Sequence, residues 1–208
     1  MILDLHNHSV RSDDSRAKVE NYCRWIRSRE LPIDGFVLTE HRQFDDDSDY
    51  RELEDRYGIA ILKASEVETD YGHVLLFGVN VDLQNAIDFT RVDHPIEVLL
   101  REAARCGAVA VPCHPGRPRV GMAAHVEARG PVPGVRIIET ASGGCRSGES
   151  EASEKLAETY GYRRVGGSDA HIVSQIGRCA TRFGAEIRNI EDLVSALGGE
   201  DYEPVTWT

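Results

Sequence analysis

The chain has 208 residues, the size of one ordinary domain that buries its own core without disulfide bonds. Its composition, 41% hydrophobic and 28% charged, is that of a globular protein, and no apolar run is long enough to cross a bilayer. The formal net charge of −11 disfavours binding to long nucleic acids, although bound divalent cations would reverse the field locally.

Cysteine usage argues against a disulfide framework and against a thiolate zinc cluster. The five cysteines are odd in number and include no Cys-x-x-Cys pair. The first residues enter a strand directly, without the basic and apolar regions of a signal peptide. We therefore expect one cytoplasmic domain over residues 1–208, with reduced cysteines and no membrane contact. The oligomeric state is left open.

Apolar segments with strand and helix periodicity alternate along the chain. The expected order is strand 2–9, helix 15–30, strand 34–39, helix 48–57, strands 59–64 and 73–79, helix 95–106, strands 108–113 and 134–139, helix 150–160, strands 162–165 and 181–187, and helix 189–197. Strands alternating with helices imply a mostly parallel sheet. Polar residues gathered at strand ends imply an α/β barrel whose active face is its C-terminal mouth.

The first strand ends in a His-x-His pair, His6 and His8. Because side chains alternate along a strand, both imidazoles project from the same side and converge on one point. Asp169 and His171, after a later strand, repeat this spacing. Imidazole and carboxylate pairs at strand ends are typical of sites for Zn, Mn or Fe.

Six of the eight histidines fall at expected strand ends, whereas His94 and His125 fall in a loop and a helix. Scattered surface histidines would show no such preference, and a barrel brings strand ends to one pocket. The alternative is a set of structural or solvated histidines. The candidate ligands are His6, His8, Asp13 or Asp14, His41, Glu66, His73, His114, Asp169 and His171.

These residues stand in an ordered series of motifs. They are Asp-Leu-His-x-His-Ser at 4–9, Thr-Glu-His at 39–41, Ser-Glu at 65–66, His-Pro-Gly-Arg at 114–117 and Gly-Ser-Asp-Ala-His at 167–171. The series, from residue 1 to about 183, resembles the PHP (polymerase and histidinol phosphatase) family of metal-dependent phosphoesterases. The resemblance implies a distorted (β/α)7 barrel with two to three divalent metal ions, Zn, Mn or Fe, at its C-terminal mouth.

Carried over motif by motif, the resemblance also implies a ligand set. One metal would be held by His6, His8, Glu66 and Asp169, a second by Glu66, His73 and His114, and a third by Asp13, His41 and His171. His73 has the alternative of a packed or hydrogen-bonded histidine at a strand start.

Two positions depart from the family pattern. The first loop commonly reads Ser-Asp-Gly, but here Asp14 stands where glycine is usual, so that Asp14 can substitute for Asp13. The family's Thr-Asp-His is here Thr39-Glu40-His41. We interpret Glu40 as a residue that orients a ligand, and we assign the same role to Glu139 and Glu68, with solvent exposure as their alternative.

The mechanism expected from this set is attack by a metal-bridging water. A carboxylate such as Glu66 that bridges two ions holds them roughly 3.5–4 Å apart, and a shared water then loses a proton and attacks phosphorus in line. Arg117 would bind the phosphate through its guanidinium, with an exposed loop arginine as the alternative. Arg119, Arg146 and Arg178 are weaker candidates for the same role.

The sequence thus favours a hydrolase of a small phosphate ester such as a nucleotide, a sugar phosphate or a compound like histidinol phosphate. A nuclease acting on oligonucleotide ends would need a basic track, which the net charge disfavours. A non-catalytic, metal-stabilised module that binds a partner is the third hypothesis. Motifs of nucleophilic hydrolases and of P-loop proteins are absent from the sequence.

Overall fold

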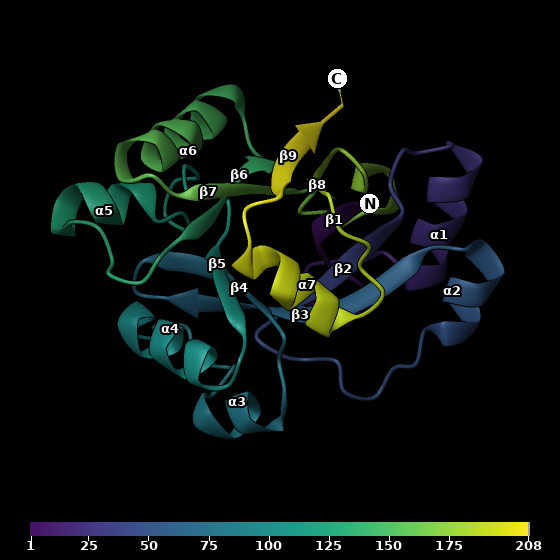
Figure 1. The fold of residues 1–208 in the computed structure, drawn as a ribbon, viewed down its shortest axis with the longest axis horizontal. Helices are drawn as coiled ribbons and strands as arrows, with labels where there is room; N and C mark the ends of the chain where they lie inside the picture. Colours follow the sequence, from purple (N-terminus) through teal and green to yellow (C-terminus); the bar gives the residue numbers. More distant parts are fainter. Residues whose placement is uncertain (208) are drawn as a thin grey trace.

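The computed structural model describes residues 1–207 and shows a mixed α/β fold, which confirms the expected class (Figure 1). Seven strands form one sheet in the order β5-β4-β3-β2-β1-β8-β9. They are β1 (Ile2–Asn7), β2 (Gly35–His41), β3 (Ala60–Thr69), β4 (Gly72–Phe77), β5 (Val109–Pro112), β8 (Cys179–Phe183) and β9 (Tyr202–Thr206). A separate parallel pair consists of β6 (Ile137–Ser142) and β7 (Arg163–Gly167).

The large sheet curls, and the β6–β7 pair fills the gap between its distant members. Strand β6 contacts β5, and β7 contacts β1. Strands β1, β2 and β3 run parallel to one another, so their carboxyl ends lie at the same edge. Residues far apart in the sequence therefore meet at this edge.

The sheet is more antiparallel than the sequence analysis predicted. Strand β4 runs antiparallel to both β3 and β5, and β8 runs antiparallel to both β1 and β9. The reason at β3–β4 is the connection, because only Asp70 and Tyr71 separate the two strands. A two-residue connection makes a hairpin, whereas a parallel crossover needs a dozen or more residues. The expectation of a mostly parallel sheet was therefore wrong.

Seven α-helices and one short 3₁₀ helix surround the described strands. They are α1 (Val19–Ser28), α2 (Arg51–Tyr57), α3 (Val81–Ala86), α4 (Ile96–Arg105), α5 (Ala123–Arg129), α6 (Ser147–Tyr160), η1 (Val173–Gln175) and α7 (Ile190–Gly198). Figure 1 shows α1 and α2 together on one side of the strands, and α5 and α6 together on the other.

Apolar spacing explains which helix faces are buried. In α1, the buried residues Val19, Tyr22, Cys23 and Ile26 follow the i, i+3, i+4, i+7 pattern of one helical face. The apolar core forms three clusters. One of them lies among the strands and includes Leu3, Leu5 and Val37. This packing fixes the strand ends that carry the candidate site.

No helix within residues 1–207 is both long and apolar enough to span a membrane. Three elements were not predicted from the sequence, the six-residue helix α3, the 3₁₀ helix η1 and the edge strand β9.

Candidate metal centre

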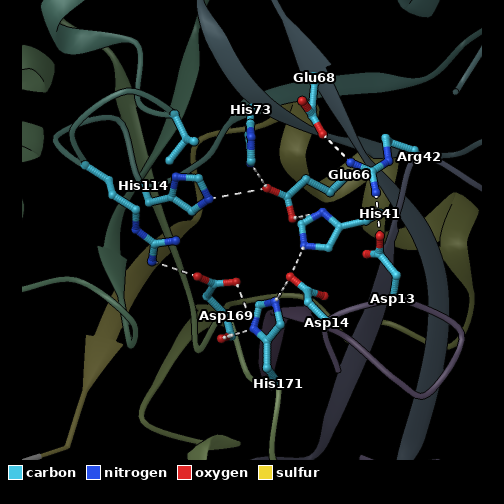
Figure 2. A pocket seen from close by; sticks show the side chains of 12 residues that line it. Asp13, Asp14, His41, Arg42, Glu66, Glu68, His73, His114, Asp169 and His171 are labelled. Carbon is cyan, nitrogen blue, oxygen red and sulfur yellow. Dashed lines mark hydrogen bonds and ion pairs between the residues drawn. The ribbon is translucent and has the colours of Figure 1, made fainter. Parts of the chain in front are cut away.

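The side chains predicted as metal ligands gather at one end of the strands, around and beneath a cavity of about 470 Å³ (Figure 2). The set comprises His6 and His8 at the end of β1, His41 at the end of β2, Glu66 in β3, His73 in β4, His114 after β5, and Asp169 and His171 after β7. Figure 2 shows the imidazoles and carboxylates of the cavity wall pointing toward one another. His94 and His125 lie elsewhere, beside the Asp88 carbonyl and Arg129 respectively.

Four buried donor atoms form the most compact group. Nε2 of His6 lies 3.1 Å from Nε2 of His8, 3.0 Å from Oε2 of Glu66 and 3.4 Å from Oδ1 of Asp169. Nε2 of His8 lies 3.1 and 3.3 Å from the same two oxygens. Ligands at ~2.0–2.2 Å from a tetrahedral Zn²⁺ are ~3.3–3.6 Å apart. The donor set therefore fits a divalent cation in chemistry and in size.

A second group surrounds the other oxygen of Glu66. Oε1 lies 2.7 Å from Nδ1 of His73, 3.3 Å from Nε2 of His114 and 3.3 Å from Sγ of Cys113. The two oxygens of one carboxylate thus face two separate sets of donors. This arrangement suits a carboxylate that bridges two ions.

A third group involves Asp14 and not Asp13. Oδ2 of Asp14 lies 3.4 Å from Nε2 of His41 and 3.2 Å from Nε2 of His171. The carboxylate of Asp13 instead pairs with Arg42 at 2.9 Å. The geometry therefore reverses the preference for Asp13, because consecutive loop residues direct their side chains to different partners.

Glu139 orients His6. Its Oε1 lies 3.0 Å from Nδ1 of His6, and its Oε2 accepts the backbone N–H of His114 at 2.9 Å. A carboxylate partner on Nδ1 leaves the Nε2 lone pair directed at the cation position. The structure thus places Glu139 where the sequence analysis expected a ligand-orienting residue.

Glu40 reaches the site through Ser12. The buried Glu40 carboxylate accepts the Ser12 hydroxyl at 2.5 Å and the backbone N–H of Ser9 at 3.1 Å. Oγ of Ser12 lies 3.4 Å from Nδ1 of His8 and accepts the backbone N–H of His41 at 3.0 Å. Glu40 therefore fixes the loop after β1. Glu68, in contrast, pairs with Arg42 at the cavity rim.

The buried carboxylates of the site are held in their charged form. Burial alone would raise the pKa of Glu66, but the imidazoles of His6, His114 and His73 lower it well below its usual range. Burial likewise opposes ionisation of Asp169, and His6 and His8 more than offset it, so that its pKa is also well below normal. Charged carboxylates are the form that binds cations.

The imidazoles divide into two classes. Burial lowers the pKa of His41 to about 4, so that this side chain is neutral near neutral pH. Burial also acts to lower the pKa of His8, but hydrogen bonds with Asp169 and Glu66 raise it to about 9. The pKa of His6 rises well above normal because the neighbouring carboxylates outweigh its burial. A metal ion that binds here must displace protons from His6 and His8.

Known proteins are similar to this chain in sequence or in fold. A family model described as PHP-associated matches residues 149–200, which include Asp169 and His171. The resemblance to the PHP family is confirmed. No curated protein matches the chain.

Solved structures share the fold of this chain. PsfC from Pseudomonas syringae is 20% identical with a TM-score of 0.73, over 100% of this chain and 91% of PsfC. The lesion-specific endonuclease PfuEndoQ from Pyrococcus furiosus is 14% identical with a TM-score of 0.70, over 98% of this chain and 57% of the endonuclease. A putative metal-dependent phosphoesterase from Bifidobacterium adolescentis is 14% identical with a TM-score of 0.58, over 94% and 95%.

Arg117 of the His-Pro-Gly-Arg motif lies in the cavity wall and pairs with a candidate ligand. One terminal nitrogen donates to Oδ2 of Asp169 at 2.7 Å. A Cβ at Gly144 would lie 2.6 Å from this nitrogen and 3.0 Å from Oδ2, so that any larger residue would require the Arg117 guanidinium to shift. Within residues 1–207, the other guanidinium N–H groups have no protein partner. Arg117 can therefore hold Asp169 and still offer donors to an anion.

Backbone strain concentrates at this candidate site. Arg42, His114 and Asp169 all have positive φ, at 54°, 33° and 51°, and all three line the cavity. Non-glycine residues seldom adopt this conformation, and strained residues cluster at functional sites.

The sequence analysis missed two contributors to the site. Ser12 was read only as part of a motif, although it joins Glu40 to His8. Cys113 was set aside with the other cysteines, although it lies next to His114 in the sequence and its thiol faces Glu66. Adjacency to a motif histidine was the signal available for Cys113.

Proposed function

We propose that the chain is a single-domain, metal-dependent phosphoesterase that hydrolyses a small phosphate ester. The observation that carries the proposal is the group of four buried donor atoms on His6, His8, Glu66 and Asp169, which lie 3.0–3.4 Å apart. The similarity of the fold to that of a putative metal-dependent phosphoesterase supports the proposal.

In this proposal, two to three divalent ions, Zn, Mn or Fe, lie at the C-terminal mouth of a distorted (β/α)7 barrel. The first is held by His6, His8, Glu66 and Asp169, the second by Glu66, His73 and His114, and the third by Asp14, His41 and His171. Asp14 replaces Asp13 because of its position beside the two imidazoles.

Bound divalent ions would supply a water of lowered pKa and positive charge opposite the phosphate. The residues of the chain contribute orientation and charge. Glu139 keeps Nε2 of His6 aimed at the cation position through its bond to Nδ1. Arg117 keeps Oδ2 of Asp169 engaged and presents its remaining N–H groups to phosphate oxygens.

The cavity favours a small substrate. Its volume of about 470 Å³ suits a ligand of the size of a nucleotide or a sugar phosphate. Both arginines in its wall, Arg42 and Arg117, are paired with carboxylates of the chain. Such a rim offers no continuous basic track for a long polyanion.

The second candidate is a nuclease, and the fold shared with the endonuclease PfuEndoQ favours it. The likeness to an endonuclease conflicts in part with our expectation that long nucleic acid is an unlikely partner. The chain spans 57% of the endonuclease, so that parts of the larger protein have no counterpart in the aligned region. The same assay should therefore include oligonucleotides with free ends and a duplex with an abasic site.

The test is release of phosphate from a panel of monoesters and diesters by protein loaded with Zn²⁺ or Mn²⁺. We expect hydrolysis of at least one small ester, and we expect His114→Ala to lower its rate by more than about 100-fold, since loss of a residue that merely orients a ligand costs about 10- to 100-fold. His125→Ala removes a histidine outside the site and is the matched control. The proposal would be contradicted if no ester of the panel were hydrolysed, or if His114→Ala left the hydrolysis unchanged. Hydrolysis of oligonucleotides and of no small ester would favour the nuclease.

A further inference from the structure

Cys113 lies at the floor of the candidate metal centre. Its side chain is fully buried, and Sγ lies 3.3 Å from Oε1 of Glu66. Donor atoms of His6, Glu66, Cys113 and His114 all lie within 4.8 Å of one another. A cysteine that only fills a core would face apolar atoms, whereas this thiol faces a carboxylate oxygen that is also within reach of two imidazoles.

The backbone explains how two consecutive side chains reach the same oxygen. Along an extended strand, neighbouring side chains point to opposite faces. Cys113 continues the inward direction of Val111, since both belong to the core cluster among the strands. His114 should then point away, but its φ of 33° breaks the alternation, and its Nε2 also lies 3.3 Å from Oε1 of Glu66. The strained residue therefore brings the sulfur and the imidazole to one place.

We propose that Cys113 is a thiolate ligand of the metal ion held by Glu66 and His114. The inference rests on the proposed function in requiring a bound divalent ion. On binding, the S–H bond breaks, the proton leaves to solvent and a sulfur–metal bond forms. A tetrahedral zinc with ~2.3 Å to sulfur and ~2.1 Å to oxygen puts these atoms ~3.6 Å apart, so that a small shift from 3.3 Å completes the site.

A sulfur ligand gives this position a metal preference. Thiolate is a soft donor that favours Zn²⁺ and Fe²⁺, whereas Mn²⁺ and Mg²⁺ prefer oxygen. The position held by His6, His8, Glu66 and Asp169 contains only nitrogen and oxygen donors. The two positions of the centre should therefore differ in selectivity.

The test is optical spectroscopy of the protein loaded with Co²⁺. Visible ligand-field bands report cobalt in the site whatever the ligands, and a near-ultraviolet sulfur-to-cobalt charge-transfer band reports a thiolate ligand. We expect the charge-transfer band in the wild type and in Cys145→Ser, a cysteine close to the site but outside the cluster. We expect Cys113→Ser to lose this band, to keep ligand-field bands, and to bind zinc at least about 10-fold more weakly.

A second measurement does not depend on the folding of the Cys113 variants. Zinc X-ray absorption of the wild type should show a sulfur neighbour at ~2.3 Å. Three results would overturn the inference: bound cobalt that shows no charge-transfer band, a charge-transfer band that remains in Cys113→Ser, or a zinc X-ray absorption spectrum without a sulfur neighbour. None of them would contradict the proposed hydrolysis. Failure to bind any divalent ion would overturn both.

Discussion

Each of three imidazoles in the centre is fixed by a partner on its Nδ1 atom. Nδ1 of His6 faces Glu139 at 3.0 Å, that of His8 faces the Ser12 hydroxyl at 3.4 Å, and that of His171 faces the Asp169 carbonyl at 3.0 Å. A carboxylate or carbonyl partner selects the tautomer that leaves Nε2 as the donor. The ligands are therefore arranged before any ion binds.

The pair of Arg117 and Asp169 can be tested through the glycine beside it. We expect Gly144→Ala to push the Arg117 guanidinium away from Oδ2 of Asp169, because the new Cβ would lie 2.6 Å from the guanidinium nitrogen. The guanidinium is the end of a flexible side chain, so that the melting temperature should change little. Hydrolysis should fall by about 10-fold, as for loss of a residue that orients a ligand.

The control for this change is Gly148→Ala, four residues along the chain. A Cβ there meets no atom within 4 Å, and alanine favours the helix in which it lies. Activity should remain at the wild-type level. Equal activity of the two variants would show that the Arg117–Asp169 pair has no part in the reaction.

At the residue scale, the sequence predicted which side chains gather at the candidate centre better than it predicted which residues contact them. Spacing along strands placed His6 beside His8, because alternation is a local property of the backbone. The choice between Asp13 and Asp14 depended on a loop conformation and on Arg42, which pairs with the Asp13 carboxylate at the cavity wall. Spacing carries no information about such a contact.

At the scale of elements, the β3–β4 hairpin organises one wall of the site. His73 pairs with Glu68 in the ladder, and Glu66 lies two residues before Glu68 on the same face. The hairpin therefore brings His73 to within 2.7 Å of Glu66, and the backbone N–H of His73 also donates to the Val120 carbonyl. Diagonal neighbours across a hairpin are close enough for such contacts.

The hairpin depends on Gly72. This residue has φ of 106°, and a Cβ on it would lie 2.5 Å from the Val120 carbonyl. We expect Gly72→Ala to lower the free energy of unfolding by about 3 kcal/mol or more, from backbone strain together with a steric clash. The displaced hairpin should also carry His73 away from Glu66. Chemical denaturation measures the first effect, and metal titration measures the second.

Gly107→Ala separates strain from clash. Gly107 also has positive φ, at 76°, but a Cβ there meets nothing within 4 Å. This variant should lose only about 1 kcal/mol, the conformational penalty alone. If the two variants lose the same free energy of unfolding, contact with Val120 does not hold the hairpin.

Helix α1, which has strong apolar periodicity, was predicted, and so was helix α2, which buries no residue, whereas α3 and β9 were not predicted. Helix α1 buries a regular apolar face, whereas α3 has six residues and buries only Leu83. Strand β9 contains Pro204, lies at the edge of the sheet, and has no residue buried. The antiparallel direction of β8 is a property of the assembled sheet and leaves no periodic signal, whereas that of β4 follows from its two-residue connection to β3.

At the scale of the whole molecule, the centre concentrates charge that folding must neutralise. Glu66 and Asp169 are buried, and protons on His6 and His8 balance them in the chain alone. A divalent ion offers the same compensation with more charge. Stability, pH and metal binding should therefore be linked.

The linkage has a definite sign. The pKa of His8 is about 9 in the folded chain and about 6.5 when unfolded, and that of His6 is shifted in the same direction. Their contribution to stability is complete below pH 6.5 and is lost as pH rises through about 9. In the presence of a chelator, we expect the free energy of unfolding to fall by about 1–3 kcal/mol across this window.

Thermal melts between pH 6.5 and 9 test this expectation. Above pH 7, His41 and Asp4, with folded pKa values of about 4 and about 6, contribute little to the slope. Burial raises the pKa of Cys23 to about 11 and that of Cys179 to about 12, so that these thiols lose protons first in the unfolded chain and add to the fall near pH 9. His8→Asn should flatten the dependence, and His125→Asn should leave it unchanged. Added zinc should stabilise more at the upper end, where His8 has already lost its proton, by about 2.7 kcal/mol at 100 times its dissociation constant. Stability that stays level across the window would contradict the assignment.

Strand β1 takes its neighbours from opposite ends of the chain, since Leu3 pairs with Gly35 on one side and with Thr181 on the other. The histidines of β1 leave the ribosome long before Asp169 and strand β8 do. During translation the nascent chain therefore exposes unpaired strand edges and a partial set of metal donors. Long-range pairing of this kind slows folding, because the loop between the paired strands must close first.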